Sequence, residues 1–365
     1  MQLKPLSILL MFLFISSVVF CQEQTKKVKS DSKKKENKPV EGNKKKTKAD
    51  LHLFDSDDVL HIALRFNVSA FIRKKSKTEY QDAVMTINPG QADSIHINVR
   101  LKSRGQFRNT YCYFPPVELN LKNSEVRYSG LDKIKLVMPC NTGTDFQDYI
   151  LREFLTYKLY SIMTDTSFRV RLLSVDMIET QKQRKPVRQY GFFIEPVEML
   201  AGRTSTTVIS TMAINQKNIK DYSIDRVAIF NYMIGNYDWA VPNQHNVKVI
   251  KPLAFDPSGL ALAVPYDFDW TGLVNASYAV PADNVGIESV RQRIFLGICR
   301  PKETYKQDLR EFVEKKEMFF KVINDFPLLS RNSKQYMINY LNEFYGQIES
   351  KDDITNTFLN SCKKF

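Results

Sequence analysis

The hydrophobic period of this chain changes near Pro196. Before that residue, apolar side chains alternate with polar ones in several short stretches, which is typical of half-buried β-strands. A single longer stretch among them has helical spacing. In the C-terminal part, apolar residues recur three and four positions apart, which is typical of amphipathic helices. This order predicts an α+β fold with two lobes, the first rich in sheet and the second helical.

The individual elements follow from the same pattern. Strands are expected at residues 95–101, 117–121, 134–138, 168–178 and 190–194, and a helix at residues 149–163. In the second lobe, Ser223 is expected to cap a helix that runs to Ile234 and stops at Gly235. Strands at residues 246–250 and 260–264 flank a turn rich in proline and glycine, which predicts a hairpin.

Residues 1–50 are predicted to lie outside the folded domain, which spans residues 51–365. Lys4 and the apolar run from Leu6 to Phe20, which is too short to stay as a membrane span, predict a secretory signal peptide over residues 1–21. Lipidation at Cys21 is the less favoured alternative, because a bulky phenylalanine precedes it. The chain is therefore expected to be exported to the periplasm or the cell surface, with no transmembrane span.

Residues 22–50 contain eleven lysines against five acidic residues and no aromatic side chain. Such a segment cannot bury enough surface to offset chain entropy, so a disordered, lysine-rich linker is predicted. We interpret it as a solubilising spacer, with contact to anionic surfaces through its lysines as the alternative. Basic residues are nowhere combined with an aromatic RNA-binding motif, so no nucleic-acid partner is expected.

Four cysteines follow the predicted signal peptide: Cys112, Cys140, Cys299 and Cys362. In an oxidising compartment they can form two disulfides, with three possible pairings. Cys112 and Cys140 each follow or precede a predicted strand end in the same lobe, so we favour that pair. None has the spacing of a zinc site, and the chain has only four histidines.

Two acidic motifs in the sequence predict the chemistry of a candidate site. The first is GNYDWAVPNQHN, from Gly235 to Asn246, and the second is PYDFDWTG, from Pro265 to Gly272. An aspartate followed by an asparagine, and then by Asp-Phe-Asp after an apolar stretch, is typical of sites that transfer phosphoryl groups. In such sites the first aspartate orients the attacking hydroxyl, and the asparagine and second aspartate hold magnesium.

With these motifs the chain resembles the CotH kinase family, the spore-coat-protein-H-like atypical secreted kinases. Three further segments carry the resemblance: VRLKSRGQFR (99–108), LREFLTYKLY (151–160) and YGFFIEPVE (190–198). The five segments occur in the family's order over most of residues 90–275. The resemblance implies a two-lobed, atypical protein-kinase-like fold, with an N-lobe over about 51–197 and a C-lobe over about 198–365. It also implies transfer of phosphate from ATP to a protein hydroxyl with Mg²⁺.

The resemblance implies roles for single residues around the acidic motifs. Asp238 would be the catalytic aspartate. Asp267 would bind magnesium, with Asp269 as a second carboxylate, since this ion usually takes one or two carboxylates and completes its shell with phosphate and water. The amide ligand would be either Asn243, which has the protein-kinase spacing from Asp238, or Asn246, whose position eight residues after Asp238 resembles the family's loop more closely.

On the nucleotide side, the resemblance implies three further roles. Arg104 would face the phosphates of ATP. Glu153, on the helix at residues 149–163, would hold the basic residue that binds phosphate. The segment from Glu195 to Val197 would form the strand edge at the adenine.

The family's phosphate-binding lysine is not found on the strand after the Arg-Gly pair, where Pro115 and Pro116 stand instead. Arg104 or Arg108 could replace it, although a guanidinium and an ammonium group are not equivalent. ATP is also scarce outside the cytoplasm. Three functions therefore stay open: an exported protein kinase, a pseudokinase or binding module of the same fold, and a metal-dependent hydrolase that uses the same carboxylates on another scaffold.

Overall fold

The computed structural model describes residues 49–50, 52–121, 126–127, 132–350 and 354–364. These residues belong to one unit that spans Thr47–Phe365. The predicted signal peptide and almost all of the lysine-rich linker lie outside the described residues. Within the described ranges, no helix combines the length and the apolar character needed to cross a membrane.

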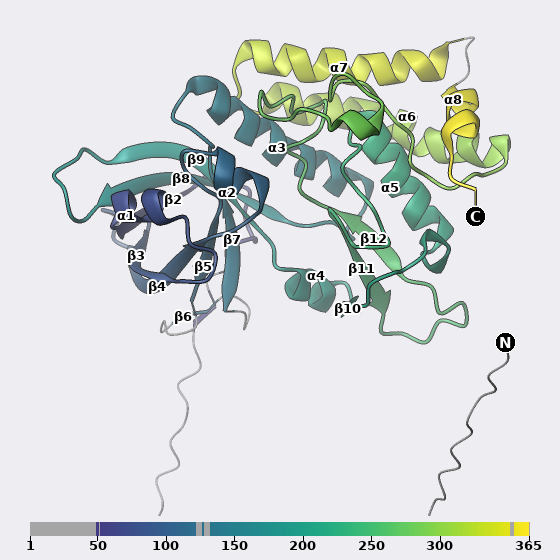
Figure 1. The fold of residues 1–365 in the computed structure, drawn as a ribbon. Helices are drawn as coiled ribbons and strands as arrows, with labels where there is room; N and C mark the ends of the chain where they lie inside the picture. The colour runs from purple at the N-terminus through teal and green to yellow at the C-terminus, as the bar shows by residue number, and fades with distance from the viewer. Residues whose placement is uncertain (1–48, 51, 122–125, 128–131, 351–353, 365) are drawn as a thin grey trace, which may run out of the picture. The chain divides into compact units, whose positions relative to one another are not determined.

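Seven strands in the first half of the described chain close into a barrel (Figure 1). Their order around the barrel is β2 (Leu60–Phe66), β3 (Gln81–Ile87), β4 (Ile95–Ser103), β5 (Val117–Asn120), β7 (Lys133–Val137), β9 (Val187–Ile194) and β8 (Val170–Glu179). All neighbours are antiparallel except β2 and β8, which pair in parallel and close the barrel. Outside it, β1 (Ala49–Asp50) pairs with β6 (Val126–Arg127).

The strands predicted from alternation form the barrel wall. Along β4, for example, Ile97, Val99 and Leu101 are buried in the barrel core, while the residues between them are at least partly exposed. The sheet-rich first part is therefore confirmed, but its closure was not predicted. The closing strand β2 and its neighbour β3 lie in a stretch to which the sequence pattern assigned no element.

Helix α3 (Thr144–Met163) lies between the barrel and the helical part of the chain. It packs on β8 and β9 of the barrel, and on α6 (Lys302–Asp325) and α7 (Arg331–Glu349). Because it has neighbours on both sides, ten of its residues are buried rather than a single stripe. The helix begins five residues before the predicted start, with Asp145 in its first turn, where a negative charge complements the helix dipole.

The second part of the chain contains far more helix than strand, in agreement with the predicted helical lobe. Besides α6 and α7 it contains α4 (Val197–Arg203), α5 (Asp221–Ile234) and α8 (Ile354–Ser361). The predicted hairpin is present as β11 (Val247–Pro252) and β12 (Leu262–Pro265), and β10 (Thr206–Ile209) adds a third antiparallel strand that was not predicted. Short helices complete the fold: α1 (Val68–Lys74), α2 (Phe107–Tyr111), η1 (Gln216–Asn218) and η2 (Asp283–Val285).

The prediction that Ser223 caps α5 is wrong. The helix begins at Asp221, with Lys220 at the N-cap position, so Ser223 lies inside the first turn. Its hydroxyl instead accepts from the amide of Ala263 in β12 at 3.0 Å and donates to the carbonyl of the same residue. The side chain thus joins the helix to the sheet, which local sequence cannot reveal.

Both disulfides join segments that lie apart in the sequence. Cys112 pairs with Cys140, as predicted, and links the end of α2 to the segment after β7. Cys299 pairs with Cys362 and links the segment before α6 to the end of α8. Both cysteines of the first pair are buried.

Replacing Gly235 with alanine is expected to destabilise the fold by about 2–4 kcal/mol, from backbone strain and overpacking. Gly235 ends α5 with a φ of +67°, and a Cβ atom there would collide with the hydroxyl of Tyr340. Gly202 in α4 is the matched control, because a Cβ atom there meets nothing within 4 Å. Urea unfolding should show little loss for Gly202→Ala; equal losses for both variants would contradict this assignment.

Candidate active site

Asp238 lies in a loop that closes on itself directly after α5. Ala240 and His245 pair as an isolated β-bridge, and the amide of Asp238 donates to Oδ1 of Asn236 at 2.9 Å. Both carboxylate oxygens have partners: Oδ1 is 2.7 Å from Nε2 of His245, and Oδ2 accepts from Nδ2 of Asn246 at 3.0 Å. The side chain keeps 33% of its surface exposed, so a hydroxyl group can reach it.

The two candidate asparagines lie in different surroundings. Asn243 is exposed, and its Oδ1 accepts from the amide of His245 at 3.2 Å. Asn246 is buried, and its Nδ2 donates to both the carbonyl and the carboxylate of Asp238. Its Oδ1 has no hydrogen-bond donor among the described residues and remains available to a ligand. The structure thus places Asn246, rather than Asn243, beside Asp238.

Asp267 is held by its backbone. Its φ is +64°, in the left-handed region, and its amide donates to the hydroxyl of Tyr157 at 2.8 Å. The amide of Tyr266 donates to the carbonyl of Asn246 at 2.9 Å, which links the two acidic motifs. The Asp267 carboxylate has no ion pair or hydrogen bond with the described residues. Backbone conformations of this kind in non-glycine residues concentrate at functional sites, where the fold holds them in place.

The two motifs converge on one cavity of about 310 Å³. Asp238, Asn246, Asp267 and Asp269 line it from the second part of the chain. Arg104, which follows β4, lines it from the barrel side, together with the residues up to Arg108. Five of the predicted site residues are therefore brought together by the fold.

Asp269 and Glu153 belong to a buried network beside this cavity. Oδ2 of Asp269 accepts from the hydroxyl of Tyr278 at 3.1 Å and lies 3.7 Å from Nη1 of Arg108. Burial and the charge of Asp267 raise the pKa of Asp269 to about 7. Burial and the charge of Asp269 raise the pKa of Glu153 well above its usual range. Burial therefore disfavours the charged form of both carboxyl groups, although Arg108 acts in the opposite direction.

Glu153 does not form the ion pair that the resemblance implies. Its side chain is buried, and neither carboxylate oxygen has a hydrogen-bond partner among the described residues. The cations that act on it are Arg108 and Arg104. The guanidinium of Arg108 is itself fixed by a hydrogen bond of 2.6 Å to the carbonyl of Met138.

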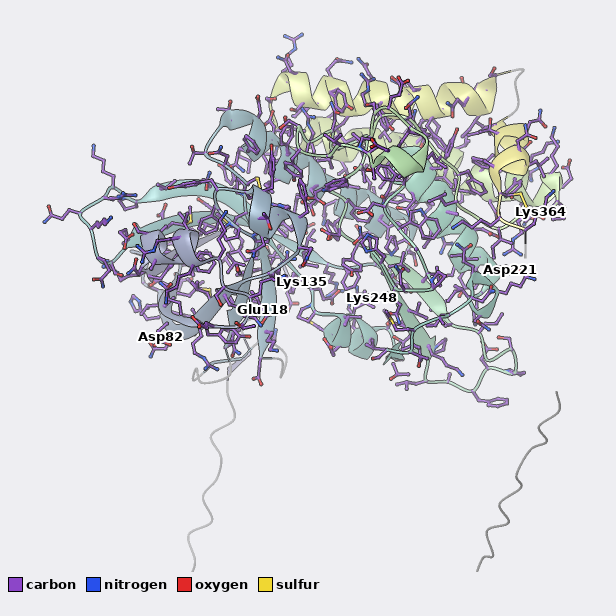
Figure 2. All side chains as sticks on the ribbon, viewed as in Figure 1. Asp82, Glu118, Lys135, Asp221, Lys248 and Lys364 are labelled. Carbon is purple, nitrogen blue, oxygen red and sulfur yellow. A yellow bond between two sulfur atoms is a disulfide. The ribbon has the colours of Figure 1, made fainter. Side chains whose placement is uncertain are left out.

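Two lysines that the sequence reasoning missed lie near Tyr266, the residue before Asp267, although neither lines the cavity itself. Lys135 in β7 and Lys248 in β11 have their ammonium groups 5.0 and 5.4 Å from the centre of the Tyr266 ring. Figure 2 labels both, one in the barrel and one in the three-stranded sheet. Burial, Arg104 and Lys248 lower the pKa of Lys135 to about 8, although Asp267 acts in the opposite direction.

Lys135 lies on β7, a predicted strand, but the family's phosphate-binding lysine was expected on the strand directly after the Arg-Gly pair. The residue sought after the Arg-Gly pair would lie on β5, whereas Lys135 lies on the next barrel strand, opposite Glu118 of β5. Ile134 and Leu136 on either side of it are buried in the barrel core. Alternation along β7 therefore turns Lys135 to the other face, and this signal was present in the sequence.

Glu195 is buried and serves the structure of the chain where it leaves the barrel. Its carboxylate forms an ion pair with Arg203 at 2.8 Å and accepts from the amide of Arg169 at 3.0 Å. Val197 begins α4 and is half-buried. The predicted contact of Glu195 with adenine would have to come from its backbone, because its side chain is occupied.

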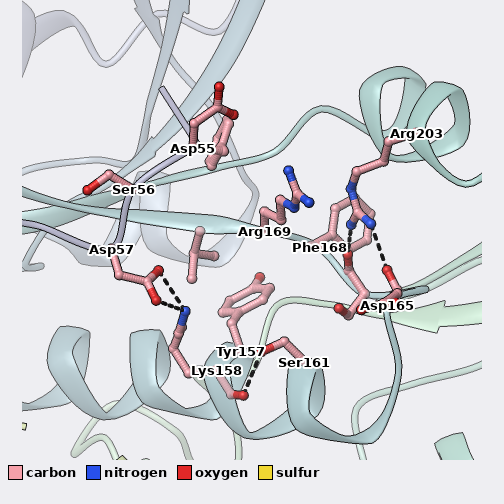
Figure 3. A pocket seen from close by; sticks show the side chains of 13 residues that line it. Asp55, Ser56, Asp57, Tyr157, Lys158, Ser161, Asp165, Phe168, Arg169 and Arg203 are labelled. Atoms are coloured by element: carbon pink, nitrogen blue, oxygen red, sulfur yellow. Dashed lines mark hydrogen bonds and ion pairs between the residues drawn. The ribbon is translucent and has the colours of Figure 1, made fainter. Parts of the chain in front are cut away.

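Figure 3 shows a larger cavity, of about 560 Å³, which Arg203 and Tyr157 help to line. Arg203 donates to the carbonyl of Asp165 at 2.7 Å, and Lys158 forms an ion pair with Asp57 at 2.7 Å (Figure 3). None of the predicted site residues lines this cavity, so its size alone does not make it the active site.

Replacing Arg203 with alanine is expected to destabilise the fold by about 3–5 kcal/mol, because it leaves the buried Glu195 carboxylate without its countercharge. The double variant Glu195→Gln/Arg203→Ala should recover part of this loss. Chemical unfolding of the single and double variants measures both effects. Equal stability of Arg203→Ala and the wild type would show that the pair is not needed.

The donor atoms at the site fit a magnesium ion. The Asp267 carboxylate and Oδ1 of Asn246 are hard oxygen ligands that have no protein partner among the described residues. Nowhere in the described chain do three or more histidine, cysteine or acidic side chains gather as a metal-binding group. Magnesium in proteins usually takes one or two carboxylates and completes its shell with phosphate and water. Asp269 as a second ligand stays a prediction, since Tyr278 and Arg108 engage its Oδ2.

Comparison with known proteins gives a structural similarity. The fold is similar to the crystal structure of a Helicobacter pylori proinflammatory kinase, CtkA, at 9% sequence identity and a TM-score of 0.38. The match covers 71% of this chain and 93% of that one. At this level the similarity supports no argument about function. No protein-family model and no curated protein sequence matches the chain.

Proposed function

We propose that this chain is a magnesium-dependent phosphotransferase that moves the terminal phosphoryl group of ATP to a hydroxyl group of a protein. One observation carries the proposal: Asp238, Asn246 and Asp267 line a single cavity with Arg104. Lys135 stands near that cavity and acts electrostatically on Asp267 and Arg104. Lys135 would take the place of the phosphate-binding lysine that the sequence lacks after the Arg-Gly pair.

Each residue at the cavity has its own role in the proposed phosphoryl transfer. Asp238 accepts a hydrogen bond from the acceptor hydroxyl and takes its proton as the oxygen attacks the terminal phosphorus. The new oxygen–phosphorus bond forms while the bond to the bridging oxygen breaks, and ADP leaves with that electron pair. Asp267 and Asn246 would hold magnesium, which neutralises phosphate charge. Arg104 and Lys135 hold the phosphate oxygens in line with the attack.

The test uses the purified protein without its predicted signal peptide, incubated with ATP and Mg²⁺. Saturable thermal stabilisation, together with transfer of label from the terminal phosphate to protein, is the expected result. Stabilisation without any transfer would assign the chain to the binding-module alternative. Metal-dependent cleavage of simple phosphate esters, without stabilisation by nucleotide, would favour the hydrolase and overturn the proposal.

A further inference from the structure

Three cations border the space around Tyr266 without a carboxylate partner. Lys135 and Lys248 come from different sheets, and their ammonium groups lie 5.0 and 5.4 Å from the Tyr266 ring centre. Neither forms an ion pair or side-chain hydrogen bond with the described residues. The Arg104 guanidinium has one partner, a backbone carbonyl, to which Nε donates at 3.3 Å.

Glu118 and Asp267 act on Lys135 electrostatically, but neither forms an ion pair with it. Glu118 stands opposite Lys135 in the barrel, but it accepts from the hydroxyl of Tyr80 at 2.5 Å and lies 3.4 Å from Lys102. Half-buried cations that repel one another are stabilised by a bound anion.

The position of Lys248 indicates what kind of anion. It lies two residues after Asn246, on the strand β11 that continues from the catalytic loop. Pockets that recognise a flat base are predominantly apolar, with few polar groups. Here β11 presents the ammonium group of Lys248 toward the Tyr266 ring, as β7 presents that of Lys135. A chain of phosphate groups carries several negative charges, which match several cations supplied by both sheets.

We propose that these cations recognise the phosphate donor by its phosphate chain rather than by its base. An inorganic polyphosphate of three or more units then binds as a nucleoside triphosphate does. This rests on the proposed function only in placing the reacting end of the phosphate chain at Asp267. Such recognition suits a chain that is predicted to act where ATP is scarce. Lys248 and Tyr266 then distinguish this site from one built around adenine.

Isothermal titration of the same protein tests the proposal, with three probes in the presence of Mg²⁺: ATP, inorganic tripolyphosphate and adenosine. Tripolyphosphate is expected to bind within about tenfold of ATP, and adenosine at least about a hundredfold more weakly. Lys248→Met should weaken ATP and tripolyphosphate alike, by about tenfold to a hundredfold, as for a lost charge-assisted hydrogen bond. Lys251→Met is the matched control, because Lys251 is exposed on the same strand and alternation turns it to the other face.

The outcomes separate this inference from the proposed function. Binding and transfer with ATP, but no binding of tripolyphosphate, would overturn the inference and leave the function standing. Binding of both phosphates without any transfer to protein would support the inference and overturn the function. Equal effects of Lys248→Met and Lys251→Met would show that Lys248 does not contact the phosphate chain, and would also overturn the inference.

Discussion

Replacing Asp238 with asparagine should lower the rate of phosphoryl transfer by about a thousandfold, while the affinity for ATP changes little. The asparagine can keep a hydrogen bond with His245 or Asn246, but it cannot take a proton from the acceptor hydroxyl. A positioned general base contributes roughly 10²–10⁴-fold to such reactions. Initial rates of label transfer, combined with ATP titration by calorimetry, measure the two quantities separately.

The control for this variant is Asp82→Asn, which makes the same chemical change on an exposed position of β3. It should transfer phosphate at the wild-type rate. An unchanged rate in Asp238→Asn would remove Asp238 from the chemistry. A rate that falls together with ATP affinity and thermal stability would assign the loop a structural role instead.

The second large effect is expected from Asp267→Asn, which should abolish the part of nucleotide binding that depends on magnesium. At a ligand concentration a hundred times the Kd, binding stabilises a protein by about 2.7 kcal/mol, and this increment should largely disappear. The physical reason is that Asp267 is the carboxylate at the site without a protein partner, so little else can replace it as a ligand. Thermal shifts with ATP, measured with and without Mg²⁺, report the loss directly.

The same variant should leave the protein without nucleotide almost as stable as the wild type. The backbone amide of Asp267, rather than its carboxylate, makes the contact with Tyr157, and asparagine tolerates a positive φ well. A variant that keeps its full magnesium-dependent shift would show that the ion, if bound, lies elsewhere. Weak binding of ATP without metal should persist, because Arg104, Lys135 and Lys248 are unchanged.

Local sequence determined much of this protein. The strands that became β4, β5, β7, β8 and β9, and the helix α3, follow from hydrophobic period, because each element buries the face that its own residues provide. The end of α5 at Gly235 was predicted from that glycine. The Cys112–Cys140 pair was predicted from neighbouring strand ends. The two acidic motifs are likewise local, and their order along the chain singled out the residues that line the cavity.

Only the tertiary structure could show which of several similar residues lie at the candidate site. Asn243 has the protein-kinase spacing and Asn246 resembles the family's loop, and only the folded loop shows that Asn246 contacts Asp238. Lys135 is one of several lysines on predicted strands, and its role depends on the opposing sheet that carries Lys248. The closure of the barrel depends on a parallel pairing of β2 with β8, whose residues are more than a hundred positions apart. Hydrophobic period tells which face of an element is buried, but pairing across such distances is decided by the packing of the whole chain.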